Sequence, residues 1–207
     1  MSEIINKFFN CDRGSRMTGN ERRLQIIKTA IEVFSKYGFS GTTTKRIAEA
    51  AGISEAMVFR HFASKDDLYA AILHNKVCED GEHQFPWEGN PALEAAMKAK
   101  NDHEVFYLLA LRALDKHHED TGFMRLLFYS ALEDHKLAEQ FVHELVGKLY
   151  VFIGGYIETR QKDGAMREMN PRVAVRAFMG MMIHHSLNNI LWDKQRHLLN
   201  ISNEEAA

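Results

Sequence analysis

The chain has 207 residues, and 45% of them are hydrophobic, which is enough apolar material for one domain or two small ones. No stretch approaches the roughly 18 consecutive apolar residues of a membrane span, and the first residues lack a signal-peptide pattern. The net charge of −2 excludes a uniformly basic protein, and two cysteines, too few for a disulfide framework, favour a cytoplasmic location.

Charge is divided unevenly along the chain. Residues 13–76 carry 11 Lys/Arg and 6 Asp/Glu, a balance of +5, whereas residues 77–207 carry 14 and 20, a balance of −6. A basic segment attached to an acidic body is typical of a phosphate-binding module joined to a second domain. With only three prolines and few β-branched runs, the composition favours an all-α protein.

The first 19 residues carry Gly14, Ser15 and Gly19 and show little periodicity, so we expect a flexible N-terminal arm over 1–18. Arg13 and Arg16 could contact DNA phosphates or a minor groove. A disordered tail without such contacts is the simpler interpretation.

The next segment predicts a helix and then a pair of short helices joined by a tight turn. A helical apolar period predicts the first helix over 19–37, and Gly38 can end it. Thr43 is a suitable N-cap for a helix over 44–51, which Gly52 can end in the left-handed conformation. Ser54 can cap a helix over 55–61. Capped short helices around a glycine turn are typical of a helix-turn-helix, although ordinary helical hairpins share this pattern.

A fourth helix is predicted from Lys65 to about residue 79, because Ser64 followed by acidic residues is a capping pattern. The whole run AIEVFSKYGFSGTTTKRIAEAAGISEAMVFRHFASKDDLY resembles the DNA-binding domain of the TetR family of bacterial transcriptional regulators. The match is dense from Glu21 to about Leu73. It departs at Phe59, where the family usually has a tyrosine whose hydroxyl contacts a phosphate, so this chain lacks that hydrogen bond.

A helix-turn-helix inserts the N-terminal end of its second helix into the major groove. On this basis Ser54, Glu55, Ala56, Met57 and Arg60 could meet bases or nearby phosphates, with Ala56 and Met57 suited to a thymine methyl group. The remaining candidates, from the preceding helix and from the resemblance, are expected at the DNA backbone. They are Thr43, Thr44, Lys45, Arg46, Phe59, His61 and Lys65.

The remainder predicts five more helices, over 91–100, 102–116, 122–134, 136–161 and 171–192, with a frayed tail from Lys194, giving about nine helices in all. The Pro/Gly segment at 83–89 is the best candidate boundary. We therefore expect a helix-turn-helix DNA-binding domain with its linking helix over 19–79, and a helical effector-binding and dimerisation domain over 80–207.

The last two predicted helices combine broad apolar stripes with glycines. A glycine inside a helix costs about 1 kcal/mol relative to alanine, and a close helix–helix approach is the usual compensation. The family resemblance implies that these helices pair with those of a second chain as a four-helix bundle, although packing within one chain is the alternative. The candidate interface residues are Leu145, Leu149, Phe152, Gly154, Ala174, Ala177, Gly180, Met181 and His184.

An effector pocket is implied mainly by the resemblance, because related regulators enclose a small ligand among their C-terminal helices. Met and aromatic side chains form adaptable walls, although each one can equally be plain core. No carboxylate or arginine could be placed inside, so the expected effector is apolar or aromatic. The candidate lining residues are Phe106, Tyr107, Leu111, Phe123, Leu127, Phe128, Tyr150, Tyr156, Met179 and Met182.

Metal and catalytic sites are not predicted. The paired histidines 117–118 and 184–185 point about 100° apart on a helix, and no two histidines stand three or four positions apart. No cofactor is expected, and no Ser-His-Asp or paired-carboxylate pattern indicates an enzyme.

The sequence thus favours a cytoplasmic, dimeric, ligand-responsive regulator, most simply a repressor, that binds a palindromic duplex DNA operator and has no membrane segment. One alternative is a DNA-binding protein of the same fold without a small-molecule effector, controlled by a protein partner or acting in chromosome organisation. An enzyme housed in the helical domain is a further alternative.

Overall fold

The computed structural model describes residues 18–75, 85, 87–195, 198 and 200–207. The predicted arm, including Arg13 and Arg16, lies outside the described residues except for Thr18. The described residues form helices and connecting loops without a strand, so the all-α prediction is confirmed for this part of the chain.

Four helices make up the head of the molecule: α2 (Gly19–Tyr37), α3 (Thr44–Ala50), α4 (Glu55–His61) and α5 (Lys65–His74). Each begins where a side-chain oxygen accepts a backbone N–H of the first turn, which satisfies one of the unpaired donors at a helix start. The capping residues are Thr18, Thr43, Ser54 and Ser64. The predicted boundaries of the first three helices are confirmed to within one residue.

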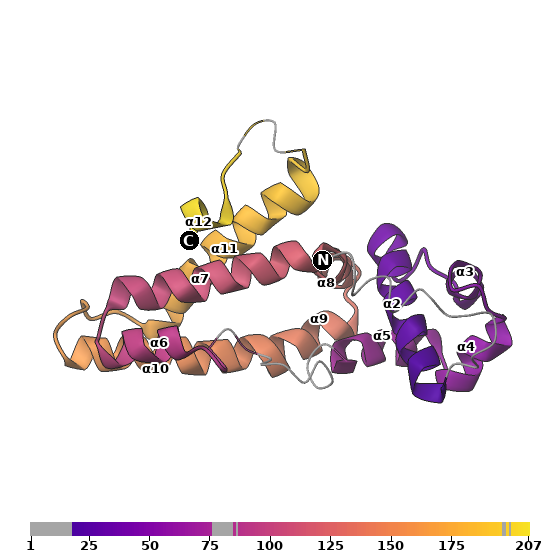
Figure 1. Ribbon diagram of the computed structural model, residues 1–207, viewed down its shortest axis with the longest axis horizontal. Coiled ribbons are helices and arrows are strands. Elements are labelled where there is room, and N and C mark those ends of the chain that lie inside the picture. Colours follow the sequence, from indigo (N-terminus) through magenta and orange to yellow (C-terminus); the bar gives the residue numbers. More distant parts are fainter. Residues whose placement is uncertain (1–17, 76–84, 86, 196–197, 199) are drawn as a thin grey trace.

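The remaining helices form the body, which extends away from the head as an elongated bundle (Figure 1). In chain order they are α6 (Pro91–Lys98), α7 (Asp102–Glu119), α8 (Thr121–Leu132), α9 (Lys136–Phe141), the π-helix η2 (Val142–Val146), α10 (Gly147–Lys162), α11 (Pro171–Leu187), the π-helix η3 (Asn188–Trp192) and α12 (Asn203–Ala206). Helix α11 packs against both α10 and α7, and α7 also packs against α6.

Two details of the prediction were wrong. The helix expected over 136–161 is divided by the π-helical turn η2, and the tail expected to be frayed forms α12. Asn203 anchors α12, because its amide donates to the Asp115 carboxylate at 2.8 Å and its oxygen lies 3.3 Å from Nε2 of His185. These two changes raise the nine expected helices to 11 α-helices in the described residues.

The head does not close its hydrophobic core by itself. Its buried residues, among them Phe34 and Tyr69, form one cluster with Leu126 and Leu127 of α8 and with Ile190. The Tyr69 hydroxyl donates to the backbone carbonyl of Leu126 at 3.3 Å. The packing of α8 against α2 therefore fixes the head on the body.

A second set of contacts joins the turn after α2 to the end of α8. The Glu133 carboxylate accepts the backbone N–H groups of Phe39 at 2.8 Å and of Ser40 at 3.4 Å. The ring of His135 lies 4.3 Å from that of Phe39 and 4.6 Å from that of Tyr69. We call Phe39, Tyr69, Glu133 and His135 the head–body junction. It ties the turn before the helix-turn-helix to the body.

The body has its own core, and a charged network closes its far end. Arg160 is only 8% exposed, and its Nε donates to Asp102 at 2.7 Å while its Nη1 donates to Asp163 at 2.6 Å. The Tyr156 hydroxyl donates to the same Asp102 carboxylate at 2.6 Å. The hydrogen bonds from Arg160 hold the pKa of Asp102 below its usual range. Burial and Asp102 raise the pKa of Tyr156 to about 12.

His117 is a half-buried histidine whose surroundings favour the neutral imidazole. Its Nδ1 lies 2.8 Å from the hydroxyl of Ser186 on α11, and burial lowers its pKa to about 4. In the unfolded chain its pKa is near 6.5. Below pH 6.5 the unfolded state therefore binds a proton that the folded state does not, so stability falls as the pH falls from 6.5 towards 4.

We expect His117→Gln to reduce this pH dependence. Between pH 7 and pH 5 the unaltered protein should lose about 2 kcal/mol more free energy of unfolding than the variant, because only it carries the imidazole with the lowered pKa. Urea unfolding at both pH values measures the difference. The control is His118→Gln, at the neighbouring exposed position. Equal pH dependence in the His117 variant and the unaltered protein would contradict the assignment.

Candidate nucleic-acid interface and body pocket

The turn between α3 and α4 has the geometry that the sequence predicts. Gly52 has φ +66°, in the left-handed region that favours glycine. The backbone N–H of Ile53 donates to the carbonyl of Ala48 at 3.0 Å, which satisfies one of the last carbonyls of α3. Ser54 then caps α4, and Val58 is 1% exposed, so one face of α4 packs on the head and the other faces outward.

Most of the predicted DNA-contacting side chains are exposed. The two helices of the helix-turn-helix, α3 and α4, lie on the side of the head that faces away from the body (Figure 1). Phe59 is 49% exposed, so the aromatic ring that replaces the usual tyrosine is presented to solvent. Met57 and His61, on the same helix, are half-buried. We define the exposed members as the candidate DNA-binding surface. They are Thr43, Lys45, Arg46, Ser54, Ala56, Phe59 and Arg60.

Two cations on this surface have no described partner. Lys45 and Arg60 form no hydrogen bond or ion pair with the described residues, and both side chains are exposed. Their positive charge is therefore available to an external anion such as a phosphate. Arg46 differs, because its Nη1 donates to the carbonyl of Gly41 at 2.9 Å and its guanidinium lies 4.2 Å from the centre of the Tyr37 ring.

Thr44 and Glu55 are paired with each other. The Thr44 hydroxyl donates to the Glu55 carboxylate at 2.5 Å, which joins the first turn of α3 to the first turn of α4. Both side chains are half-buried. In this conformation their polar atoms serve the packing of the two helices, so the structure does not present them as free contacts for bases.

Lys65 lies in a different environment from the one predicted. Its ammonium donates to the backbone carbonyls of Phe39 at 2.8 Å and Thr42 at 3.0 Å, and it lies 4.0 Å from the centre of the Phe39 ring. These contacts fold the side chain onto the turn after α2, where the Phe39 carbonyl also accepts the backbone N–H of Thr42 at 3.2 Å. The expected phosphate contact is replaced here by an internal one.

Most candidate interface residues of α11 lie on an outward face. Ala177, Gly180, Met181 and His184 are exposed, and Met181 retains 66% of its accessible surface. Ala174 is half-buried. An added Cβ at Gly180 would meet no atom within 4 Å, so this glycine is not required by packing within the chain.

On α10 the prediction chose the wrong face. Leu149 and Phe152 pack in the body core, where the Phe152 ring stacks on Trp87 at 4.4 Å. Gly154 is buried against Pro171 and Val175 of α11, so the close approach that it allows is within the chain. The exposed face of α10 instead carries Val151, which is 77% exposed. The side chain of Leu145 lies outside the described residues.

The predicted effector residues do not gather around one cavity. Phe123, Leu127 and Phe128 belong to the core shared with the head, whereas Tyr150 and Tyr156 belong to the body core. Apolar side chains on helices of similar periodicity cannot be assigned to a cavity or to solid core before the helix crossings are known. Of the predicted effector residues, only Phe106 lines the pocket described next. The remaining members are packed or half-buried, and they are Tyr107, Leu111, Met179 and Met182.

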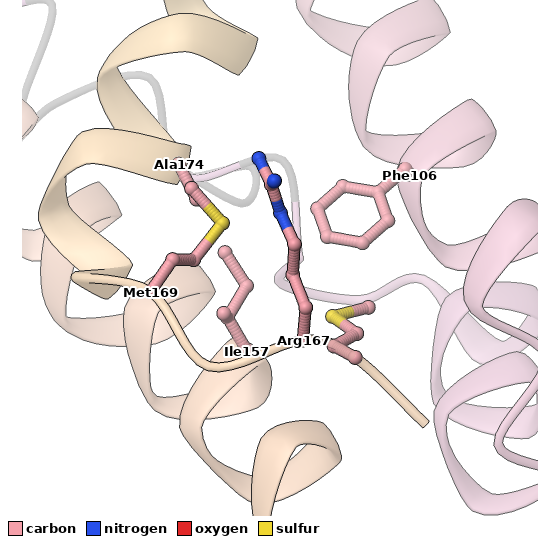
Figure 2. A pocket seen from close by; sticks show the side chains of 6 residues that line it. Phe106, Ile157, Arg167, Met169 and Ala174 are labelled. Atoms are coloured by element: carbon pink, nitrogen blue, oxygen red, sulfur yellow. The ribbon is translucent and has the colours of Figure 1, made fainter. Parts of the chain in front are cut away.

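A pocket of about 280 Å³ opens at the end of the body, between α7, the end of α10 and the loop that leads into α11. Five of its six lining residues are apolar, and the sixth is Arg167. Figure 2 shows the Arg167 side chain between the ring of Phe106 on one side and Ile157 and Met169 on the other. Met166 and Ala174 complete the lining. Sequence reasoning missed this arginine; its place in the loop after Gly164, between two methionines, was the available signal.

Within the described ranges no group of three or more His, Cys, Asp or Glu side chains could hold a metal ion. No helix in the described part of the chain is both long and apolar enough to span a bilayer.

The amino-acid comparison places the head in a known family. Residues 26–72 match the model of the bacterial regulatory proteins of the tetR family. The head is therefore similar to the DNA-binding domains of the TetR family, and the match does not extend to the body. Over 65 residues it is 40% identical to the transcriptional activator FasR of Mycolicibacterium smegmatis, covering 31% of this chain and 30% of FasR. It is 40% identical over 52 residues to the regulator RutR of Escherichia coli K12, covering 25% of this chain and 24% of RutR.

These sequence matches therefore span less than a third of either relative. The fold likeness extends much further. The solved structure of AibR in complex with isovaleryl coenzyme A and operator DNA aligns with a TM-score of 0.64 and 19% identity, covering 90% of this chain and 94% of AibR. At this identity the likeness shows that the TetR-type helix-turn-helix and C-terminal helical architecture are shared.

We expect Lys65→Met to destabilise this TetR-type head. The methionine keeps an apolar stem near Phe39 but leaves two backbone carbonyls without their charged donor, which should cost about 2 kcal/mol of free energy of unfolding. The matched variant Lys45→Met removes an exposed, unpaired ammonium and should leave stability within about 0.5 kcal/mol. Urea unfolding compares the two variants, and equal stability would show that Lys65 does not hold the turn.

Proposed function

We propose that this chain is a transcriptional regulator that binds operator DNA as a dimer through α4 and its flanks. The observation that carries the proposal is an exposed, capped second helix of a TetR-type helix-turn-helix, with Arg60 on it and Lys45 on the preceding helix both lacking internal partners. Such unpaired cations bind phosphates or base edges with little reorganisation. Residues 19–79 then act as the DNA-binding domain and residues 80–207 as the dimerisation and effector domain.

Within this proposal the roles on the head are divided. Thr43, Lys45 and Arg46 meet the DNA backbone, whereas Ser54, Ala56, Met57 and Arg60 meet the major groove. Glu55 and Thr44 order the two helices, and Lys65 holds the turn before them. Phe59 contributes apolar contact without the hydrogen bond that a tyrosine would donate, and His61 lies at the edge of the surface.

The outward faces of α10 and α11 support pairing of two copies. Val151 on α10 and Val173, Ala177, Gly180 and Met181 on α11 present small and apolar side chains to solvent in the isolated chain. Exposed small and apolar side chains on neighbouring helices are typical of an interaction site. A twofold pairing places two α4 helices on one side, which matches an operator of two inverted half-sites about one turn of DNA apart or a multiple of it.

The body pocket supports control by a small molecule. In the simplest form of control the protein is a cytoplasmic repressor, and the bound ligand releases it from DNA. The helix α7 carries Phe106 in the pocket at one end and leads into α8, which packs against α2, at the other. A ligand that shifts α7 therefore changes how the head packs on α8. The coupling is reciprocal, so bound DNA weakens ligand binding by the same factor.

The probe is a duplex that the unaltered protein has enriched from a random pool. We expect Arg60→Ala to weaken binding to this duplex about tenfold or more, because one charged contact to a base or phosphate is lost. Fluorescence anisotropy at fixed salt measures the affinity. The control is Lys98→Ala, which removes one exposed positive charge from α6 in the body. If both variants bind as tightly as the unaltered protein, Arg60 does not contact DNA.

We expect Gly180→Glu to yield monomers. A side chain at this position enters open space in the isolated chain, so the fold is unaffected, but a twofold pairing would bring two carboxylates into an apolar interface. Sedimentation velocity measures the mass, and circular dichroism checks the fold. Arg172→Glu, on another face of α11, should remain dimeric; a dimeric Gly180 variant would place the interface elsewhere.

A further inference from the structure

The body pocket combines an apolar wall with one cation. Five of its lining residues offer hydrocarbon, sulfur or an aromatic ring, and Arg167 offers the only charged group among the six. Arg167 is exposed overall, and the apolar side chains beside it in Figure 2 offer its guanidinium no hydrogen-bond acceptor. This is the arrangement that an amphipathic anion complements, with an apolar tail on the wall and a negative head on the guanidinium.

The guanidinium of Arg167 has no partner among the described residues, and two carboxylates of the same end of the body are engaged with other cations. Asp102 accepts two hydrogen bonds from Arg160. Asp163 accepts one hydrogen bond from Arg160 and forms an ion pair with Lys100 at 2.9 Å. Glu168, next in the chain, is exposed and does not line the pocket. The local charge therefore leaves one cation unneutralised at the pocket.

The loop that carries Arg167 is held in place on both sides. The side-chain amide of Gln161 donates to the backbone carbonyls of Arg167 and Met169, each at 2.9 Å. Asn170 caps α11, a helix of 17 residues whose first turn contributes Ala174 to the pocket wall. The positive end of the α11 dipole adds to the charge of Arg167 and likewise favours an anion.

We propose that this pocket binds a monocarboxylate with an unbranched or lightly branched hydrocarbon tail, whose carboxylate pairs with Arg167 while the tail lies on Phe106 and Ile157. At roughly 30 Å³ for each small non-hydrogen atom, a cavity of about 280 Å³ holds about nine such atoms, which corresponds to an acid of six to eight carbons. The inference rests on the proposed function only in naming the class of its effector.

The experiment uses the full chain without DNA and octanoate as the probe. Isothermal titration calorimetry compares octanoate with 1-octanol and octylamine, which have the same tail and a neutral or cationic head. Octanoate should bind tightest, and Arg167→Gln should weaken its binding about tenfold through loss of a charge-assisted pair. Arg167→Lys should retain part of the affinity. Arg172→Gln, which removes a nearby exposed charge outside the pocket, should bind octanoate as the unaltered protein does.

The outcomes are distinguishable from those of the DNA experiments. Octanol binding as tightly as octanoate, or equal octanoate affinity in the Arg167→Gln variant, would overturn the role of Arg167. No octanoate binding by a protein that still binds its enriched duplex would overturn this inference alone. Octanoate binding by a protein that does not bind duplex DNA would support the inference and overturn the proposed function.

Discussion

The structure depends on the head–body junction, where the body completes the core of the head. Tyr69 packs edge-on to Phe34, its ring touches that of His135, and its hydroxyl donates to the backbone of Leu126. Glu133 accepts the N–H groups of the turn after α2. The buried residues of the four-helix head form one cluster with Leu126 and Leu127, so α8 supplies one wall of its core. The price of this arrangement is that the head cannot move independently of α8.

That constraint links the two proposed sites. The loop–α7–α8 path runs from the pocket at the far end of the body to the helix on which the head is seated (Figure 1). Packed interfaces have discrete arrangements rather than continuous ones, so a small shift of α7 can change the seat of the head. Arg160, which joins α10 to Asp102 at the start of α7, keeps the pocket end of this path rigid.

Local signals predicted the elements well, and tertiary contacts limited the rest. Thr43, Gly52 and Ser54 act within one turn of their own position, so the head could be outlined from the sequence. The role of Lys65 could not be foreseen, because two carbonyls distant in the sequence, not an external phosphate, receive its ammonium. Phe152 could not be assigned to the core, nor Arg167 to a pocket, from the sequence. Their surroundings depend on how the body helices cross, which periodicity does not specify.

The central claim is that two heads, each held at a fixed angle by its body, read two DNA half-sites. The most direct measurement is the sequence pattern enriched by the intact protein from a pool of random duplexes. The account predicts inverted half-sites at one fixed spacing near one helical turn or a multiple of it. Enrichment of a single unrepeated site, of half-sites at variable spacing, or of no sequence at low salt would contradict it.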